Sequence, residues 1–91
     1  MKRVVRTLSY QEDLDAIEAY IAQDNPKAGI DMWLNIDDQV KKLADPNFPR
    51  RIGRVDNTFE LVAHPNYIVI LEEDATSVTA LNVVHARKKY P

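Results

Sequence analysis

The sequence predicts one α+β domain over residues 1–91: an N-terminal strand, an antiparallel helical hairpin, and a three- to four-stranded antiparallel sheet. Three observations support this fold class. At 91 residues, the chain is below the size at which proteins usually divide into domains. Its first half carries apolar residues at helical spacing, and its second half has short alternating or apolar runs between polar turns. Sequential strands with tight links favour a meander covered on one face by the helices.

The first segment, Lys2–Leu8, contains two adjacent valines and is predicted to be a short strand. A capping box follows at Ser9–Glu12, in which the serine hydroxyl accepts an amide hydrogen bond and the glutamate reaches back. A helix is therefore expected from Ser9 to about Gln23. Its buried face is marked by apolar residues spaced four, three and four apart: Tyr10, Leu14, Ile17 and Ile21.

A second helix is predicted to run to Ala44. Asn25 can cap its N-terminus, Pro26 suits its first position, and Pro46 stops the chain from continuing it. Its buried stripe consists of Met32, Ile36, Val40 and Leu43. Because the break between the two helices is only two or three residues, they should form an antiparallel hairpin.

Ile30 and Leu34 lie on a different face of this second helix from the buried stripe. One interpretation is that the sheet or the first helix covers them, and this is the one we favour from the sequence. The other is that they form a second apolar strip that contacts a partner, either another protein or a second copy of this chain.

The second half of the chain reads as strands. Apolar and polar residues alternate over Thr58–His64, which is strand periodicity. Tyr67–Leu71 is apolar on both faces, as in a central strand covered on both sides. Ser77–His85 is rich in β-forming residues, and a further short strand is possible around Ile52. The predicted order is therefore β-α-α-β-β-β.

Composition excludes several classes of function. The absence of cysteine removes disulfides, thiol nucleophiles and cysteine metal sites, and two histidines are too few for most zinc enzymes. We therefore expect no metal and no cofactor. The chain has no apolar run near the ~20 residues of a membrane span, so we expect a cytoplasmic protein without membrane contact. A net charge of −2 argues against broad or sequence-specific nucleic-acid binding by the chain alone.

Basic residues gather in two short runs that could carry chemistry. His85 and Arg87 lie two residues apart near the end of the last predicted strand, so their side chains are expected to point to the same face. A histidine beside an arginine can act as a general base for RNA cleavage. The alternative is a strand-end histidine followed by a basic tail that makes surface contacts. The two runs could also converge into one patch for an acidic partner or a phosphate backbone: Arg50, Arg51 and Arg54 in the first, and Arg87, Lys88 and Lys89 in the second.

Motifs in a fixed order along nearly the whole chain resemble the ParE side of the RelE/ParE toxin superfamily, the plasmid-stabilisation or toxin–antitoxin proteins. None of them is specific alone, but their order and spacing together are. The segments that carry the resemblance are Ile17–Ile21, Asp24–Pro26 with Ala28, Leu43 with Pro46, Arg51–Arg54, Glu60–Val62, Tyr67–Leu71, Val83–Arg87 and Tyr90–Pro91.

The resemblance implies a small toxin that a cognate antitoxin neutralises by wrapping around it with a helix and often an added strand. ParE-like members are taken to inhibit DNA gyrase, whereas RelE-like members cleave messenger RNA on the ribosome. Antitoxin contact is expected at Ile30 and Leu34. Contact with the target is expected at Arg51, Arg54, His85, Arg87, Lys88, Lys89 and Tyr90.

The residues of the sheet favour gyrase over RNA cleavage. A RelE-type site needs lysines and arginines on the middle strands to stabilise a highly charged transition state. Here those strands offer Phe59, Glu60 and Tyr67 instead, and only Arg87 matches the arginine of the last strand. We therefore expect a protein inhibitor rather than a catalyst, with RNA cleavage by His85 and Arg87 as the alternative. A third possibility is a non-toxic antitoxin-binding module, because ParE relatives commonly carry arginine where Phe59 stands.

Overall fold

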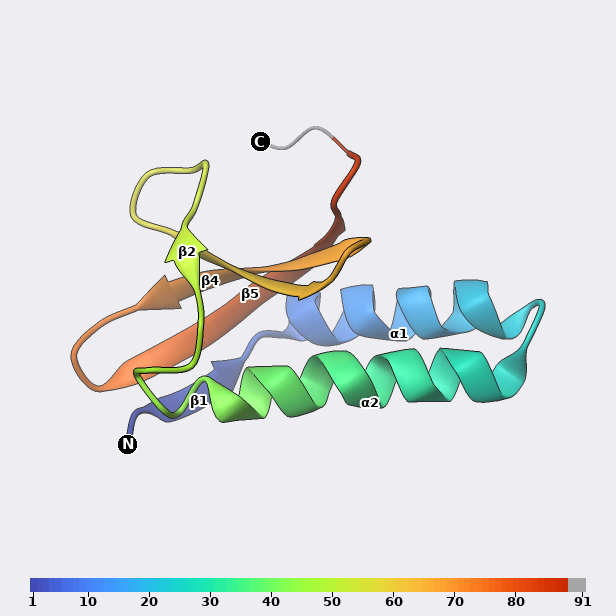
Figure 1. Ribbon diagram of the computed structural model, residues 1–91, viewed down its shortest axis with the longest axis horizontal. Coiled ribbons are helices and arrows are strands. Elements are labelled where there is room, and N and C mark those ends of the chain that lie inside the picture. Colours follow the sequence, from blue (N-terminus) through green and yellow to red (C-terminus); the bar gives the residue numbers. More distant parts are fainter. Residues whose placement is uncertain (89–91) are drawn as a thin grey trace.

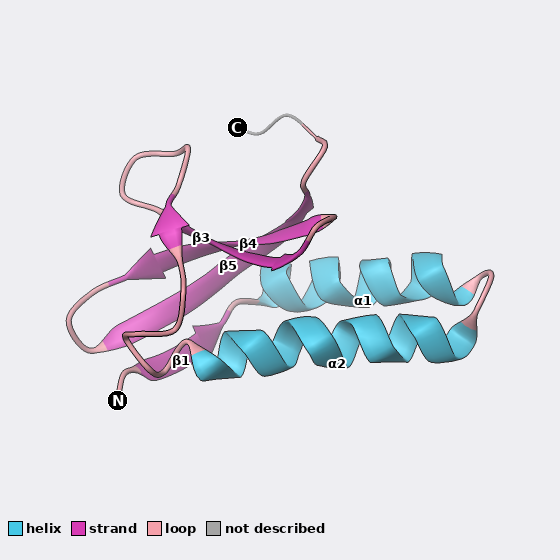
Figure 2. Ribbon diagram, in the orientation of Figure 1, coloured by secondary structure: helices cyan, strands magenta, loops and turns pink. Residues whose placement is uncertain are grey.

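The computed structural model describes residues 1–88 and consists of a five-stranded sheet with a helical hairpin on one face (Figures 1 and 2). Within this range, no helix combines the length and apolarity that crossing a bilayer requires. The elements in chain order are β1 Arg3–Arg6, α1 Leu8–Ala22, α2 Pro26–Lys42, β2 Arg51–Ile52, β3 Phe59–His64, β4 Tyr67–Glu73 and β5 Ser77–His85.

The sheet is mixed, with strand order β1-β5-β4-β3-β2. Strands β2 to β5 form the expected antiparallel meander, and the short strand around Ile52 is β2. The N-terminal strand joins this meander by pairing with β5 in parallel, with Arg3 opposite Ser77. Because β1 and β5 run in the same direction, this pairing makes the sheet mixed rather than purely antiparallel.

Helix α1 begins earlier than the sequence predicts, and its cap is Thr7 rather than Ser9. The Thr7 hydroxyl accepts a hydrogen bond from the Tyr10 amide at 3.0 Å and donates one to the Leu81 carbonyl at 2.8 Å. Thr7 therefore caps the helix and ties its start to β5, whereas Ser9, two residues later, already lies inside the helix. The Asn25 cap of α2 is confirmed, because its side chain accepts from the Ala28 amide. Helix α2 ends at Lys42, two residues before the predicted end.

The hydrophobic core lies between the helical hairpin and the sheet. All five residues of Tyr67–Leu71 are buried, as predicted for a central strand. Three of the four residues in the predicted stripe of α2 are fully buried, and Met32 packs partly against them. The largest fully buried apolar side chains are Tyr10, Leu14, Ile36, Leu43, Leu71, Val40, Val69 and Val78.

The interpretation in which Ile30 and Leu34 are covered is wrong, because they are 50% and 55% exposed. The reason lies in how closely the two helices approach at Gly29. A Cβ added there would lie 2.7 Å from the Glu18 carbonyl oxygen, so only glycine lets α1 pack this close. With Gly29 and Ile36 facing inward, the helical rotation turns Ile30 and Leu34 away from the core.

Candidate target-binding surface

The two basic runs of the sequence do not converge. Arg51 lies on β2, opposite Glu60 near the start of β3. His85 is paired with Tyr67, which in turn is paired with His64 at the end of β3. Strands β3 and β4 separate β2 from β5, about 14 Å at the usual strand spacing. The loop after β2 and the segment after β5 both leave the sheet away from the helices, at separate places (Figure 1). Within residues 1–88, strand order therefore places the two runs apart, against the possibility of one shared patch.

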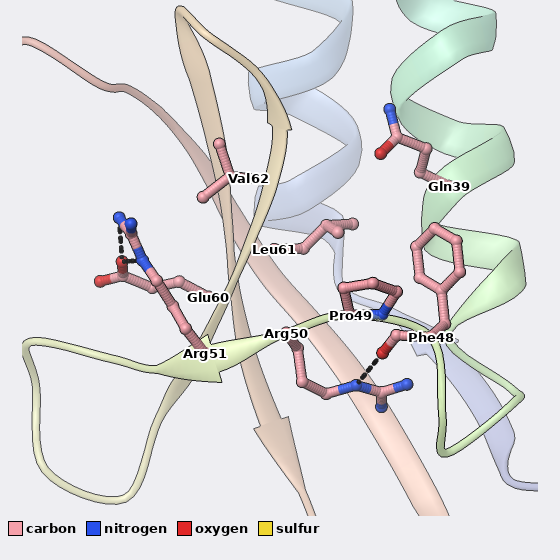
Figure 3. A pocket seen from close by; sticks show the side chains of 8 residues that line it. All are labelled: Gln39, Phe48, Pro49, Arg50, Arg51, Glu60, Leu61 and Val62. Carbon is pink, nitrogen blue, oxygen red and sulfur yellow. Dashed lines mark hydrogen bonds and ion pairs between the residues drawn. The ribbon is translucent and has the colours of Figure 1, made fainter.

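Arg50 is a structural residue rather than part of a surface patch. Its side chain is 7% exposed and pairs with Glu73, which also binds Lys2 at 3.0 Å. Its remaining nitrogens donate to backbone carbonyls of the segment that follows α2. One of these bonds, to Phe48 at 3.0 Å, is seen in Figure 3, and another reaches Asp45 at 2.6 Å. These bonds clamp that segment to the end of β4. In the sequence, the three arginines of this run cannot be told apart. Burial of the side chain in the folded chain distinguishes Arg50 from the other two.

Arg51 is held by Glu60, one of the polar residues in the alternating pattern of β3. The Arg51 Nε and Nη2 atoms both lie 2.9 Å from the Glu60 Oε1 atom (Figure 3). The Glu60 side chain is 1% exposed, whereas that of Arg51 is 54% exposed. Alternation along β3 puts Glu60 on the face away from the helices, but it does not reveal that the segment before β3, with Arg51 and Arg54, packs against its carboxylate.

Arg54 lies in the loop between β2 and β3, and its backbone amide donates to the second Glu60 oxygen, Oε2, at 3.2 Å. The Gly53 amide donates to the Thr58 carbonyl at 2.9 Å, and the Thr58 hydroxyl donates to the Val55 carbonyl. Only glycine fits at position 53, because an added Cβ would lie 2.3 Å from the Thr58 hydroxyl oxygen. The loop is therefore closed on itself and attached to the sheet through a carboxylate.

His85 is the last residue of β5, so the strand alternation that would align it with Arg87 does not continue. The alternation from which a common face was predicted therefore does not extend to Arg87. Instead, the Arg87 amide donates to the His85 Nδ1 atom at 3.2 Å, and the ring meets Tyr67 edge-on with centroids 5.5 Å apart. When the ring is neutral, its proton is on Nε2. Burial raises the pKa of the Tyr67 hydroxyl, so this neighbour stays neutral.

Two hollows flank these basic segments. One, of about 610 Å³, lies between α1 and the end of β5, and its lining includes Tyr20, His85 and Lys88. The other, of about 380 Å³, lies between α2 and β3, and Phe48, Leu61 and Val62 give it apolar walls (Figure 3). Lys89 and Tyr90, which the sequence also assigns to target contact, lie outside the described residues. Among residues 1–88, no cluster of three or more potential metal ligands occurs.

The middle strands of the sheet carry no cation. Strand β3 reads FELVAH and β4 reads YIVILEE, without a lysine or an arginine in either. Neither of these two strands therefore supplies a lysine or an arginine that could stabilise a breaking phosphodiester near His85.

Residues 4–90 match the family described as the ParE toxin of the type II toxin–antitoxin system, parDE. The chain belongs to the ParE toxin family. It is 34% identical over 90 residues to the curated "Putative toxin Y4kP" of Sinorhizobium fredii, covering 99% of this chain and 94% of that one. The fold matches a solved structure of the chromosomal ParDE toxin–antitoxin system from P. aeruginosa with a TM-score of 0.80. That match covers 93% of this chain and 96% of the other at 20% identity.

Membership of the ParE family agrees with the α+β fold and with the resemblance found in the sequence. It makes this chain a ParE-type toxin of a type II toxin–antitoxin system. Two functional features were missed at the level of sequence. Nothing in the sequence signals that Glu60 is buried, because its pairing with Arg51 is known only from the strand register. The 84% exposure of Ile52 could not be predicted either, since its strand has only two residues.

Proposed function

We propose that this ParE-family chain acts in the cytoplasm by binding DNA gyrase and blocking it, without catalysing a reaction, and that a cognate antitoxin holds it inactive. The observation that supports this most is the absence of lysine and arginine from β3 and β4. RNA cleavage without a metal needs such cations beside the reacting phosphate. Contact with a protein does not need them there.

The target-binding surface proposed here is made of two separate segments. The first is the loop that carries Arg51 and Arg54, flanked by the exposed apolar side chains of Ile52 and Val55. Its mixture of positive and apolar groups suits a protein surface with acidic residues around an apolar contact. The second is the segment after β5, with His85, Arg87 and Lys88. Lys89 and Tyr90 extend it in the sequence.

The antitoxin is proposed to cover the outer face of α2 at Ile30 and Leu34, which are half-exposed there. A second place for it is the edge of the sheet. Strand β2 pairs only with Phe59 and Glu60, so the rest of β3, including the 47% exposed Val62, has no strand beside it on that side within the described chain. A disordered segment can fold onto both an apolar helix face and a strand edge.

The decisive experiment is a gyrase supercoiling assay with the purified chain. We expect relaxed plasmid to remain relaxed when the chain is in molar excess, and cleaved gyrase–DNA complexes to accumulate. Relief of the block by the protein encoded beside this gene would support the antitoxin partner. Gyrase that supercoils at full rate under these conditions would rule out the proposed target.

One observation favours a second candidate, a ribosome-dependent endoribonuclease. His85 and Lys88 both line the larger hollow, beside Tyr20 and Tyr67. A translating extract programmed with one defined message tests it: cleavage that is lost in His85→Ala would support this candidate, and intact message would reject it. Normal growth after strong induction without an antitoxin would instead identify a non-toxic antitoxin-binding member.

A further inference from the structure

Glu60 is the only charged residue that is buried as a whole among residues 1–88. It lies on β3, on the face of the sheet away from the helices, where its strand partners are Arg51 and Ile70. Taking a carboxylate out of water is costly, and an apolar residue of similar volume would usually fill such a place more favourably. The contacts of this carboxylate therefore indicate what it does.

Both oxygens of Glu60 bind the same short segment of the chain. Oε1 accepts from the Arg51 guanidinium at 2.9 Å, and Oε2 accepts from the Arg54 amide at 3.2 Å. Apart from Arg51 on β2, these partners belong to no helix or other strand, so the carboxylate adds little to the joining of the main elements. Its two bonds instead fix where the loop between β2 and β3 leaves the sheet.

This loop has few other ways to keep its shape. Ile52 is 84% exposed and Val55 is 37% exposed, so apolar packing contributes little. The loop closes through backbone bonds between Gly53, Thr58 and Val55, and Asn57 takes the left-handed conformation with φ of 65°. These local bonds define a turn, and the two-residue pairing of β2 with Phe59 and Glu60 attaches its base to the sheet. The Glu60 side chain adds a second attachment beyond that pairing, at the Arg54 amide.

We infer that Glu60 is a positioning residue: it holds the loop of residues 51–58 in its docking shape before any partner arrives. This inference rests on the proposed function, because that function makes the loop a target-binding surface. The partner it suits is a protein surface with acidic groups for the basic side chains and an apolar contact for Ile52 and Val55. A preformed loop loses less conformational freedom on binding than one that must be ordered by the partner.

Amide hydrogen exchange tests the attachment directly. The variant Glu60→Gln keeps the shape of the side chain but removes its charge, and Glu72→Gln changes an exposed carboxylate of the neighbouring strand as a control. We expect the Arg54 amide to exchange at least tenfold faster in Glu60→Gln, with the Val69 amide changed less than twofold. An unchanged Arg54 amide would overturn the inference. So would acceleration of Val69 by the same factor, since that would report only a loss of global stability.

The effect on docking is measured with gyrase. The concentration that gives half-maximal inhibition should rise at least fivefold for Glu60→Gln and stay unchanged for Glu72→Gln. If Glu60→Gln frees the loop yet inhibits as well as the parent chain, the positioning role is wrong. If the parent chain itself does not inhibit gyrase, the proposed target fails, and hydrogen exchange still decides whether Glu60 holds the loop.

A second variant covers the case in which Glu60→Gln does not fold. Arg51→Lys retains the positive charge opposite Glu60 but removes the contact made through Nε and Nη2. We expect the Arg54 amide to exchange about threefold faster in this variant, again with Val69 unchanged. No change at Arg54 would show that the ion pair does not hold the loop.

Discussion

The two basic segments of this chain are attached to the same sheet in different ways. The loop of residues 51–58 depends on single side chains: the buried Glu60 carboxylate, the missing Cβ of Gly53, and Arg50 just before it. The segment after β5 is held by backbone amides, with Ala86 bonded to the Asn66 carbonyl at 2.8 Å and Lys88 to the His85 carbonyl at 3.0 Å. The first arrangement is sensitive to mutation at a few positions, whereas the second tolerates changes of side chain.

The largest expected difference between the segments is in stability. Arg50→Ala should lower the free energy of unfolding by about 3–5 kcal/mol, because it leaves the buried Glu73 carboxylate without its main partner. Arg87→Ala, on the exposed segment, should change it by less than about 0.5 kcal/mol. Urea unfolding of the two variants measures both values. Equal effects would show that the two segments do not differ in this way.

Gly53→Ala should destabilise the chain by about 1–3 kcal/mol, because the new methyl group would collide with Thr58. The matched change on the other segment is Ala86→Gly, which removes a methyl group and should cost at most about 1 kcal/mol. Both can be compared by thermal unfolding under the same conditions. A Gly53→Ala variant as stable as the parent would mean that the loop can rearrange without cost.

The separation of the segments predicts additive effects on gyrase. Arg54→Ala and Arg87→Ala should each weaken inhibition by about tenfold, or about 1.4 kcal/mol. The double variant should weaken it by about a hundredfold, because substitutions more than 7–10 Å apart without shared partners are usually additive. A double variant no weaker than either single one would indicate one shared contact and contradict the separation of the two segments.

The smallest expected change in stability is at Ile52. Because its side chain is 84% exposed, Ile52→Thr should alter the free energy of unfolding by less than about 0.5 kcal/mol. Its effect should instead appear as weaker binding to gyrase. The combination of unchanged unfolding and unchanged inhibition would remove Ile52 from the proposed surface.

Much of the fold could be predicted from the sequence, because it depends on local patterns. The helical hairpin follows from apolar spacing and from the Asn25–Pro26 break, and the central strand from its continuous apolar run. The start of α1 was misplaced because Thr7 and Ser9 are both good caps. Only the bond from Thr7 to the Leu81 carbonyl, a contact between distant parts of the chain, distinguishes them.

The candidate site was less predictable, since it depends on which charges are buried. From the sequence we predicted target contact at Arg51, Arg54, His85, Arg87 and Lys88, but the sequence could neither separate their two segments nor exclude Arg50 from the surface. That separation follows from strand order and register, which place Tyr67 between His64 and His85 and leave Arg51 opposite Glu60.

By itself, the sequence determined the element types, the apolar core and the family, because periodicity, caps and ordered motifs are properties of the chain read in one dimension. The tertiary structure alone decided that Ile30 and Leu34 face outward, that Arg50 is buried while Arg51 is half-exposed, and that Glu60 lies beneath a loop. Whether a side chain is buried depends on which other parts of the folded chain pack over it. The energy of a charge depends on that cover far more than on its neighbours in sequence.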